Sequence, residues 1–548
     1  MSIKGVVTAM FDLKIIHGHI VDGTGEKSYA ADIGIIGDKI AAIGDLSDFE
    51  SKETLDAAGK MVSPGFIDIH THSDFSFIYD TKANSHLYSG VTTEVISNCG
   101  IGPAPVKAEE KETLIAYLGT RLIGSIPVEL KLPWNSMKEY LHTFTINKPC
   151  INIAPLVAQG AIRIAVMGLE KGDAAPEQLD MMRKLTREAM EDGALGLSTG
   201  LVYMPGEYTS KEEIAELCKE IKPYGGVYCT HMRTESDGLL EALDEALWIA
   251  ATGEVPVEIS HLKLLSQTML GKTDIVLNKL ANAEAAGIEV NYDLYPYTAG
   301  VTSLAACLPP WLFEGGVDKL LERIKDADIR RRIDLEIEQG IPGWQNFVKS
   351  AGGWKKFYVS SVNYEKNKSF EGKFITEIAE MQGTDPLDTV CDLLIAENGR
   401  VQMNYYAMDE EDVMTFLKQS KAMIGSDSMS LSCEGILHFG KPHPRAFGTP
   451  TRFLGRYVRD KKLMSFEEAI RKMTSLPAQK LHMNSRGILK PGYFADIVIF
   501  DPETITDTAT YIKPQQYSTG ISDVIVNGKA ALRNGVQQDV CAGQVVSR

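Results

Sequence analysis

The chain has 548 residues, 44% of them hydrophobic and 24% charged, enough for one large domain with a sizeable core and at least one accessory domain. Its net charge of −17 argues against binding to nucleic acids or to anionic membranes. No N-terminal segment resembles a secretion signal, and no apolar run reaches the ~18 residues of a membrane span. The eight cysteines form no C-x-x-C pair, so we predict a cytoplasmic protein in which seven of them are reduced thiols and Cys99 is the exception.

The first 63 residues have the alternating pattern of short antiparallel strands, as in DLKIIHGHIVDG and ADIGIIGDKIAAIG, with glycine and aspartate turns between them. His17 and His19 in the first of these segments have H-x-H spacing, but we interpret them as ordinary strand residues. The last residues, 486–548, return to the same β pattern. Both ends of the chain are therefore predicted to be β structure.

Between residues 64 and 485, predicted strands alternate with amphipathic helices; for example, VYCTHM is followed by DGLLEALDEALWIAATG. This alternation is typical of a parallel sheet, and the number of units predicts a closed (β/α)8 barrel of the α/β class. The stretch at about 311–356 does not fit the repeat. We predict that it is an insertion, mostly helical and charged, which lies over the mouth of the barrel.

The segment PGFIDIHTHSD ends the first predicted barrel strand with His70 and His72. Residues i and i+2 of a strand point to the same side, so both imidazoles are expected at the barrel mouth. Asp68 has the same parity and is expected one layer deeper, as a partner of these histidines. The alternative is a pair of histidines packed in the barrel core.

Four more residues with metal-binding or proton-transfer side chains end later predicted strands: Cys99, His231, His261 and Asp427. Active sites of (β/α)8 barrels lie at the carboxyl ends of the strands, so these side chains should converge. Imidazole, thiolate and carboxylate are the ligands of a catalytic zinc site. The alternative, without a metal site, is that the two histidines pack in the core, that the cysteine is an ordinary buried thiol, and that the aspartate caps a helix. We predict a metal-dependent hydrolase in which Asp427 is a general base or a weak ligand.

Several motifs together resemble the D-aminoacylases (N-acyl-D-amino-acid deacylases) of the amidohydrolase superfamily. They cover nearly the whole chain and are PGFIDIHTHSD, GVTTEVISNCG, THMRTE, ISHLK, DLYPYTAG, IGSD and HPRAFGTPTRFLGRYVR. The resemblance implies a zinc-binding (β/α)8 barrel from 64–485 and a small β-sandwich domain built jointly from 1–63 and 486–548. It also implies hydrolysis of N-acyl-D-amino acids, small molecules, to a carboxylate and a free D-amino acid.

The resemblance further assigns roles to individual residues. A tightly bound zinc would be held by Cys99, His231 and His261. A second, weaker site would use His70 and His72 and share Cys99. The catalytic aspartate maps to Asp427, which would take a proton from metal-activated water and return it to the leaving amine. The substrate carboxylate would be bound by three residues: Lys263, Tyr295 and Arg445.

The chain departs from the family at Ser97 and Ser428, where glycine is usual, and the segment between Asp427 and Arg445 is longer. Residues 298–313, after the predicted binding tyrosine, contain no lysine or arginine, which favours substrates with neutral, mostly apolar side chains. Arg233 or the insertion could instead supply a cation for N-acyl-D-glutamate or N-acyl-D-aspartate. Two competing hypotheses are hydrolysis of a cyclic amide or a D-dipeptide at the same metal site, and a non-catalytic scaffold that keeps the barrel.

Overall fold

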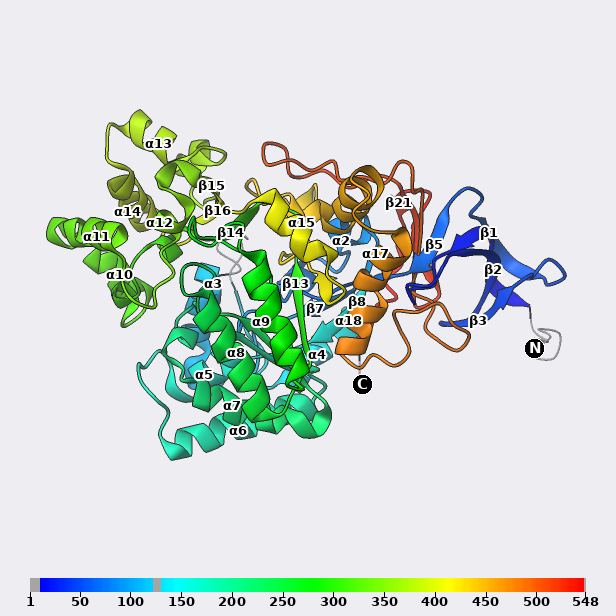
Figure 1. Cartoon of the computed structure of the whole chain (residues 1–548), viewed down its shortest axis with the longest axis horizontal. Helices are drawn as coiled ribbons and strands as arrows, with labels where there is room; N and C mark the ends of the chain where they lie inside the picture. The colour runs from blue at the N-terminus through cyan, green and yellow to red at the C-terminus, as the bar shows by residue number, and fades with distance from the viewer. Residues whose placement is uncertain (1–9, 122–129, 547–548) are drawn as a thin grey trace.

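The computed structural model describes residues 10–121 and 130–546. Three parts follow one another along the longest axis in Figure 1: a β-sheet region at the end where the N-terminus lies, a barrel surrounded by helices in the centre, and a mainly helical region at the other end. Within the described ranges, no helix is long and apolar enough to cross a membrane.

The central barrel has eight strand positions. They are β6 (Phe66–Asp68), β7 (Val91–Ile96), β8 (Asn152–Pro155) with its continuation β9 (Val157–Ala158), β10 (Gly196–Gly200), β11 (Val227–His231), β12 (Val257–Ile259), β13 (Val290–Leu294) and β17 (Ala422–Ile424). Neighbouring strands pair in parallel from β6 to β8 and from β9 to β17. A parallel bridge between Thr71 and Ser428 joins the ends of β6 and β17 and closes the barrel. The predicted (β/α)8 fold is confirmed.

Helices cover the outside of the barrel. They are α3 (Lys111–Arg121), α4 (Met137–Ile146), α5 (Gln159–Met167), α6 (Pro176–Glu191), α7 (Lys211–Ile221), α8 (Leu239–Gly253), α9 (Thr273–Ala285), α15 (Glu410–Lys418), α16 (Arg445–Arg452), α17 (Phe466–Met473) and α18 (Ser475–Lys480), with the short α1 (Ser76–Tyr79) and α2 (Asn84–Leu87) near β6 and β7. Helix α7 shows why they form: Ser210 caps its first turn, and Ile214, Leu217 and Ile221 repeat at helical spacing on its buried side.

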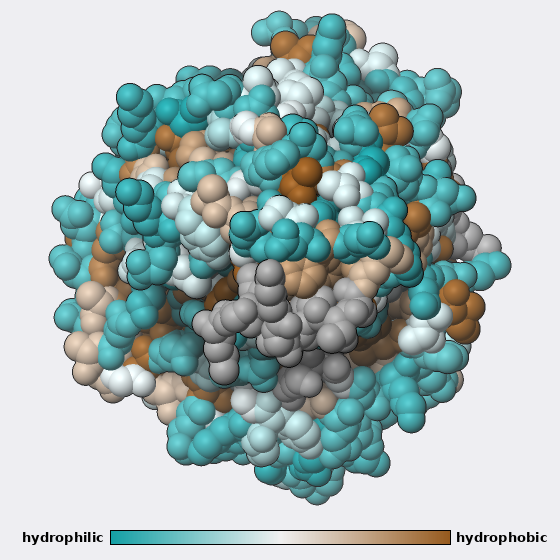
Figure 2. Space-filling view, turned by 90° about the vertical axis from the view of Figure 1, so that its right-hand side faces the viewer, coloured by the Kyte–Doolittle hydropathy of each residue, from teal (hydrophilic) through white to brown (hydrophobic). Residues whose placement is uncertain are grey.

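Both chain ends contribute to one nine-stranded sheet. Its strands are β1 (Phe11–Ile20), β2 (Tyr29–Ile36), β3 (Lys39–Gly44), β4 (Ser51–Asp56), β5 (Met61–Pro64), β18 (Ile497–Phe500), β19 (Ile521–Val526), β20 (Lys529–Arg533) and β21 (Val536–Gln537). N-terminal β5 pairs with C-terminal β18, and β1 pairs with β4 through one half and with β5 through the other. The surface on this side is mainly hydrophilic, with scattered hydrophobic residues (Figure 2).

The exact domain limits, 1–63 with 486–548 and 64–485, stay a prediction, and residues 1–9 and 547–548 lie outside the described residues. His17 and His19 lie in β1 of this sheet, where each pairs with a sheet-domain side chain: His17 Nδ1 lies 3.0 Å from Asp56, and His19 Nε2 lies 2.8 Å from Ser28. They therefore take no part in the barrel mouth.

A large excursion separates β13 from β17. It contains the antiparallel strands β14 (Ala299–Ser303), β16 (Gln402–Tyr406) and β15 (Phe357–Ser361), and the helices α10 (Val317–Arg323), α11 (Ala327–Gln339), α12 (Phe347–Ala351), α13 (Ile375–Gln382) and α14 (Pro386–Ala396). It has a hydrophobic core of its own. The insertion that we predicted at 311–356 covers only part of it, because β15 and β16 are each followed by helices and so imitate further β/α units of the barrel.

Candidate metal centre and active site

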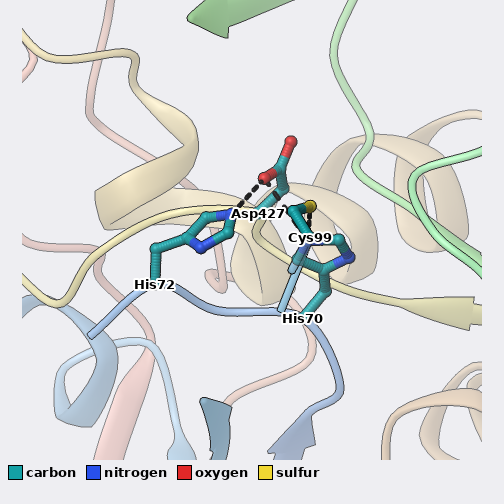
Figure 3. A group of neighbouring side chains, drawn as sticks. All are labelled: His70, His72, Cys99 and Asp427. Atoms are coloured by element: carbon teal, nitrogen blue, oxygen red, sulfur yellow. Dashed lines mark hydrogen bonds and ion pairs between the residues drawn. The ribbon is translucent and has the colours of Figure 1, made fainter. Parts of the chain in front are cut away.

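Three loops after barrel strands bring a first group of potential ligands together. His70 and His72 follow β6, Cys99 follows β7, and Asp427 follows β17 (Figure 3). His70 Nε2 lies 3.2 Å from Cys99 Sγ, and His72 Nε2 lies 3.2 Å from Asp427 Oδ1. All four side chains are buried. One ligand atom from each lies within 4.8 Å of the others.

A second group shares the same cysteine. Cys99 Sγ lies 3.5 Å from His261 Nε2, which lies 2.8 Å from Nδ1 of His231. His231 is the last residue of β11, and His261 follows β12 by two residues. Cys99 therefore stands between two histidine pairs, His70 with His72 and His231 with His261.

The backbone bends sharply where three of these side chains enter the mouth. Cys99, His261 and Asp427 have φ angles of 55°, 37° and 50°, in the left-handed region that side chains other than glycine rarely adopt. Such conformations cost about 1–3 kcal/mol each and persist where the surrounding structure imposes them, often at functional sites. Each bend follows a strand and directs its side chain across the mouth.

The chemistry of the donors fits a transition metal such as zinc. Ligand atoms bound to one tetrahedral zinc, at ~2.0–2.3 Å, lie roughly 3.3–3.6 Å apart. The distances from Cys99 Sγ to His70 and His261, 3.2 and 3.5 Å, are close to this range. Buried lone pairs that converge at such distances repel one another unless a proton or cation lies between them. Mixed thiolate and imidazole ligands favour zinc over magnesium or calcium.

The surroundings favour the thiolate form of Cys99. Burial by itself raises the pKa of this thiol, but the adjacent imidazoles of His70 and His261 outweigh burial and hold the pKa well below its usual value. The thiolate, not the thiol, is the form that binds metals.

Two buried carboxylates that the sequence analysis did not single out orient the ligand histidines. Asp293 Oδ2 lies 2.9 Å from Nδ1 of His70, and Glu235 Oε1 lies 2.9 Å from Nδ1 of His261. Carboxylate partners of this kind fix the ring orientation and the tautomer of metal-binding histidines. Asp293 lies in the motif DLYPY and Glu235 in the motif THMRTE, and membership of these family motifs is the feature of the sequence that could have pointed to them.

Asp68, which we expected to be a partner of these histidines, contacts His70 through the backbone and forms no hydrogen bond with the imidazole of His70 or His72. Its Oδ1 accepts hydrogen bonds from the backbone N–H of Ser426 at 2.9 Å and of His70 at 3.3 Å. It therefore ties the ends of β6 and β17 together, and Asp293 takes the place beside the imidazole. Burial raises the pKa of Asp68 to about 6, although His86 and Ser426 partly oppose this.

Ser97 and Ser428 stand where the resemblance leads us to expect glycine. Ser97 has a φ of 63°, a conformation that glycine adopts at less cost. Its hydroxyl donates a hydrogen bond of 2.5 Å to Asp74 Oδ1, which holds the turn. The carbonyl of Ser428 accepts a hydrogen bond of 3.0 Å from the backbone N–H of His72. Both serines thus belong to the framework of the mouth.

The three residues predicted to bind a substrate carboxylate lie beside the metal-ligand cluster. Arg445 Nη1 lies 2.8 Å from Asp427 Oδ2, and its guanidinium stacks 4.6 Å from the ring centre of Tyr295. Lys263 Nζ lies 2.5 Å from Glu235 Oε1 and 5.8 Å from the same tyrosine ring. Both cations are buried. Each pairs with a carboxylate of the site.

One cavity connects these groups. Its wall includes His72, Cys99, His231, His261 and Asp427 on the metal-ligand side and Lys263, Tyr295 and Arg445 beside them. The rest of the wall comes largely from the excursion and from the loop after β17, including Val301, Phe347, Gln402, Tyr405, Met429 and Phe439. The structure thus brings all the predicted site residues except His70, whose Nε2 lies 3.2 Å from Cys99 Sγ, to the surface of one cavity.

Replacement of Glu235 by glutamine is expected to lower the affinity for metal about 10- to 100-fold, because His261 loses its charged partner. The measurement is retention of metal during dialysis against graded concentrations of a chelator. Glu245→Gln is the matched control, since Glu245 pairs with Arg233 at 2.9 Å and not with a ligand histidine. Equal retention by Glu235→Gln and the wild type would show that Glu235 does not support the ligand.

Known proteins resemble this chain in sequence and in structure. The profile described as Amidohydrolase family matches residues 53–328 and 377–531. The chain is 35% identical to the D-aminoacylase of Alcaligenes xylosoxydans xylosoxydans over 98% of both chains. It is 33% identical to the N-acyl-D-glutamate deacylase of the same organism, over 95% of this chain and 93% of the relative. The crystal structure of an N-acyl-D-glutamate deacylase from Bordetella bronchiseptica, complexed with zinc and a phosphonate inhibitor, superimposes with a TM-score of 0.81 at 30% identity, over 98% of this chain and all of the other.

Proposed function

Because the chain belongs to the D-aminoacylases of the metal-dependent amidohydrolase family, we propose that it hydrolyses the amide bond of N-acyl-D-amino acids to a carboxylate and a free D-amino acid. The observation that carries this proposal is the presence, in one cavity, of a thiolate and imidazole cluster next to two buried cations, Lys263 and Arg445. The cluster suits a metal that activates water, and the cations suit the α-carboxylate that every N-acyl amino acid carries.

We assign the tight zinc site to Cys99, His231 and His261, and a second, weaker site to His70 and His72 with Cys99 in common. A zinc ion in the tight site would lower the pKa of bound water to ~7 and polarise the amide carbonyl. The chain's own contribution is to hold the ligands: Asp293 and Glu235 orient one histidine of each site.

Asp427 is the proposed proton carrier. Its Oδ1 lies 3.2 Å from His72 Nε2 and 3.5 Å from His70 Nε2, at the boundary between the ligand cluster and the cavity. From there its carboxylate can accept a proton from the attacking water and return it to the departing amine nitrogen. Its other oxygen pairs with Arg445 at 2.8 Å. A substrate carboxylate that binds Arg445 would compete with this pair and leave Asp427 available to the reaction.

Selectivity for the D-enantiomer would follow from the number of substituents of the substrate α-carbon that the site holds in place. The arginine fork and Lys263 would hold the α-carboxylate, and the amide bond would have to lie between Asp427 and the residues that would hold the metal. With two substituents of the α-carbon fixed, only one hand can direct its side chain into the remaining space of the cavity.

Lys263→Ala and Arg445→Ala are each expected to raise KM for an N-acyl-D-amino acid about 10- to 100-fold, the effect of losing one charge-assisted hydrogen bond of about 1.5–3 kcal/mol. Initial-rate kinetics over a range of substrate concentrations measure it. Arg456→Ala serves as a control, because Arg456 pairs with Glu410 at the surface. Unchanged KM values in both variants would remove these residues from carboxylate binding.

The cavity favours neutral substrate side chains. Of the described residues that line it, only Lys263 and Arg445 are lysine or arginine. Arg233, the alternative cation, is engaged elsewhere, with Glu245 at 2.9 Å and with the carbonyls of Glu207 and Thr209 at 2.8 and 3.0 Å. The remaining wall is aromatic, aliphatic or uncharged and polar. We therefore propose that side chains such as those of D-methionine or D-leucine are preferred over D-glutamate.

The test is a comparison of the purified, metal-analysed protein on N-acetyl-D-methionine, N-acetyl-L-methionine and N-acetyl-D-glutamate. Fast release of D-methionine, with little activity on the other two, is the expected result. A preference for the D-glutamate derivative would overturn the proposed side-chain specificity but would still support the proposed deacylase activity. Bound zinc without activity on any of the three would overturn the deacylase proposal and point to cyclic amides or D-dipeptides.

A further inference from the structure

The C-terminal segment returns to the start of barrel strand β8. The N–H of Gly543 donates to the carbonyl of Pro149 at 2.9 Å, and Ile153 exchanges backbone hydrogen bonds of 3.0 and 2.8 Å with Gln544 and Val546. An isolated parallel bridge joins Ile153 to Val545. These contacts hold the end of the chain against the barrel.

Two cysteines face each other across this contact. Cys150 Sγ and Cys541 Sγ lie 2.6 Å apart, although 391 positions separate them in the sequence. This distance is well inside the separation of ~3.6 Å at which two sulfur atoms that are not bonded come into contact, and it approaches the ~2.05 Å of a disulfide bond. Cys150 is buried, whereas Cys541 is exposed.

The surroundings make Cys541 the more nucleophilic of the two thiols and Cys150 its partner. The neighbouring Cys150 thiol and the hydroxyl of Thr81, 3.9 Å away, act against burial and lower the pKa of Cys541 to about 7. The pKa of Cys150 moves in the opposite direction, because of its contact with Cys541 and its burial. The exposed sulfur is thus both the accessible one and the one that ionises first.

We propose that Cys150 and Cys541 are a modification site at which a peroxide forms a disulfide bond that fastens the C-terminal segment to the barrel. The Cys541 thiolate attacks one oxygen of hydrogen peroxide, which gives a sulfenic acid and releases water once the leaving hydroxide is protonated. The Cys150 sulfur then displaces the sulfenic oxygen as a second water. In total, two thiols and one hydrogen peroxide give one disulfide and two waters, with the thiols oxidised and the peroxide reduced.

The bond would close a loop of the chain that contains six of the eight barrel strand positions, from β8 to β17. Cross-links over long loops restrict the unfolded chain most. It lies beside the amino end of β8, whereas the cavity lies at the carboxyl ends of the barrel strands. We therefore expect oxidation to raise the thermal unfolding midpoint and to leave turnover unchanged. This inference is independent of the proposed deacylase activity.

The experiment treats the metal-loaded protein with hydrogen peroxide and counts free thiols after denaturation, followed by tryptic peptide mapping without reduction. Two of the eight thiols should disappear, and peptides 139–163 and 534–548, which contain Cys150 and Cys541, should appear as one linked species that a reductant separates. The oxidised protein should unfold at a higher temperature than the reduced protein.

Cys541→Ser is the main variant, because this side chain is exposed and its replacement leaves the core intact. It should give no linked peptide and no oxidation-dependent rise in unfolding temperature, and Cys150→Ser should behave in the same way. Cys433→Ser, which removes a partly exposed thiol outside the pair, should keep both effects. Eight free thiols after oxidation of the wild type, a link between other cysteines, or a rise that persists in Cys541→Ser would each overturn the proposal.

Discussion

Asp427→Asn is expected to lower kcat for an N-acyl-D-amino acid about 100- to 10,000-fold, the usual contribution of a general acid–base group. Asparagine has nearly the same shape, and its carbonyl oxygen can still accept a hydrogen bond from Arg445. It cannot take up the proton of the attacking water. The expected defect is therefore in turnover, while KM changes little because Lys263 and Arg445 remain.

Metal analysis separates this role from that of a ligand. Asp427 is a member of the group that contains His70 and His72, but not of the group of Cys99, His231 and His261. Asp427→Asn should therefore keep about the same tightly bound metal as the wild type. Asp460→Asn, at an exposed aspartate paired with Arg459, controls for general effects of the substitution. If Asp427→Asn turned over at the rate of the wild type, the proton would have to be carried by another group.

The charges around Asp427 also set how turnover should respond to acid. Burial by itself raises the pKa of this carboxyl, but Arg445 and His261 outweigh burial and keep the pKa well below its usual value. In the free enzyme the Asp427 carboxyl is therefore ionised throughout the neutral range. Loss of Asp427 should therefore lower the rate at every neutral pH rather than shift the pH profile.

The parts of the site that the sequence predicted share two properties. Residues such as His70, Cys99 and His231 combine an unusual side chain with a position at the end of a predicted strand. Parity and barrel topology alone then place them at one mouth. Glu235 and Asp293 do not have an unusual side chain. Carboxylates are common in any sequence, and the sequence alone does not distinguish an exposed carboxylate from one that supports a buried imidazole.

Long-range pairing explains the other differences. The antiparallel order of β14, β16 and β15 depends on register between distant segments, and the local pattern of a strand followed by a helix is the same in a barrel unit. The pair of Cys150 and Cys541 was likewise invisible, because spacing in the sequence says nothing about two cysteines 391 positions apart. Three-dimensional proximity was needed for both.

Cys99→Ser is expected to have the largest effect on the metal, because its sulfur is common to both ligand groups. The serine hydroxyl has nearly the same size but stays protonated at neutral pH and is a harder, weaker ligand for zinc. A single histidine replacement, such as His231→Asn, removes a ligand from one group only. Cys99→Ser should therefore lose its tightly bound metal during a dialysis in which the wild type keeps its metal. Turnover should fall in parallel by at least about 100-fold, an effect as large as the loss of a general acid–base group or larger.

Three measurements on the same preparation make this decisive: metal per chain by atomic spectroscopy, turnover before and after added zinc, and the thermal unfolding midpoint. Cys433→Ser is the control, since its thiol lies outside both ligand groups. A folded Cys99→Ser protein that is poor in metal and inactive supports the shared ligand. Full metal content together with full turnover in Cys99→Ser would assign the site to the histidines alone, and Cys99 would then be one more small buried side chain in the barrel, held in a strained turn for reasons of packing.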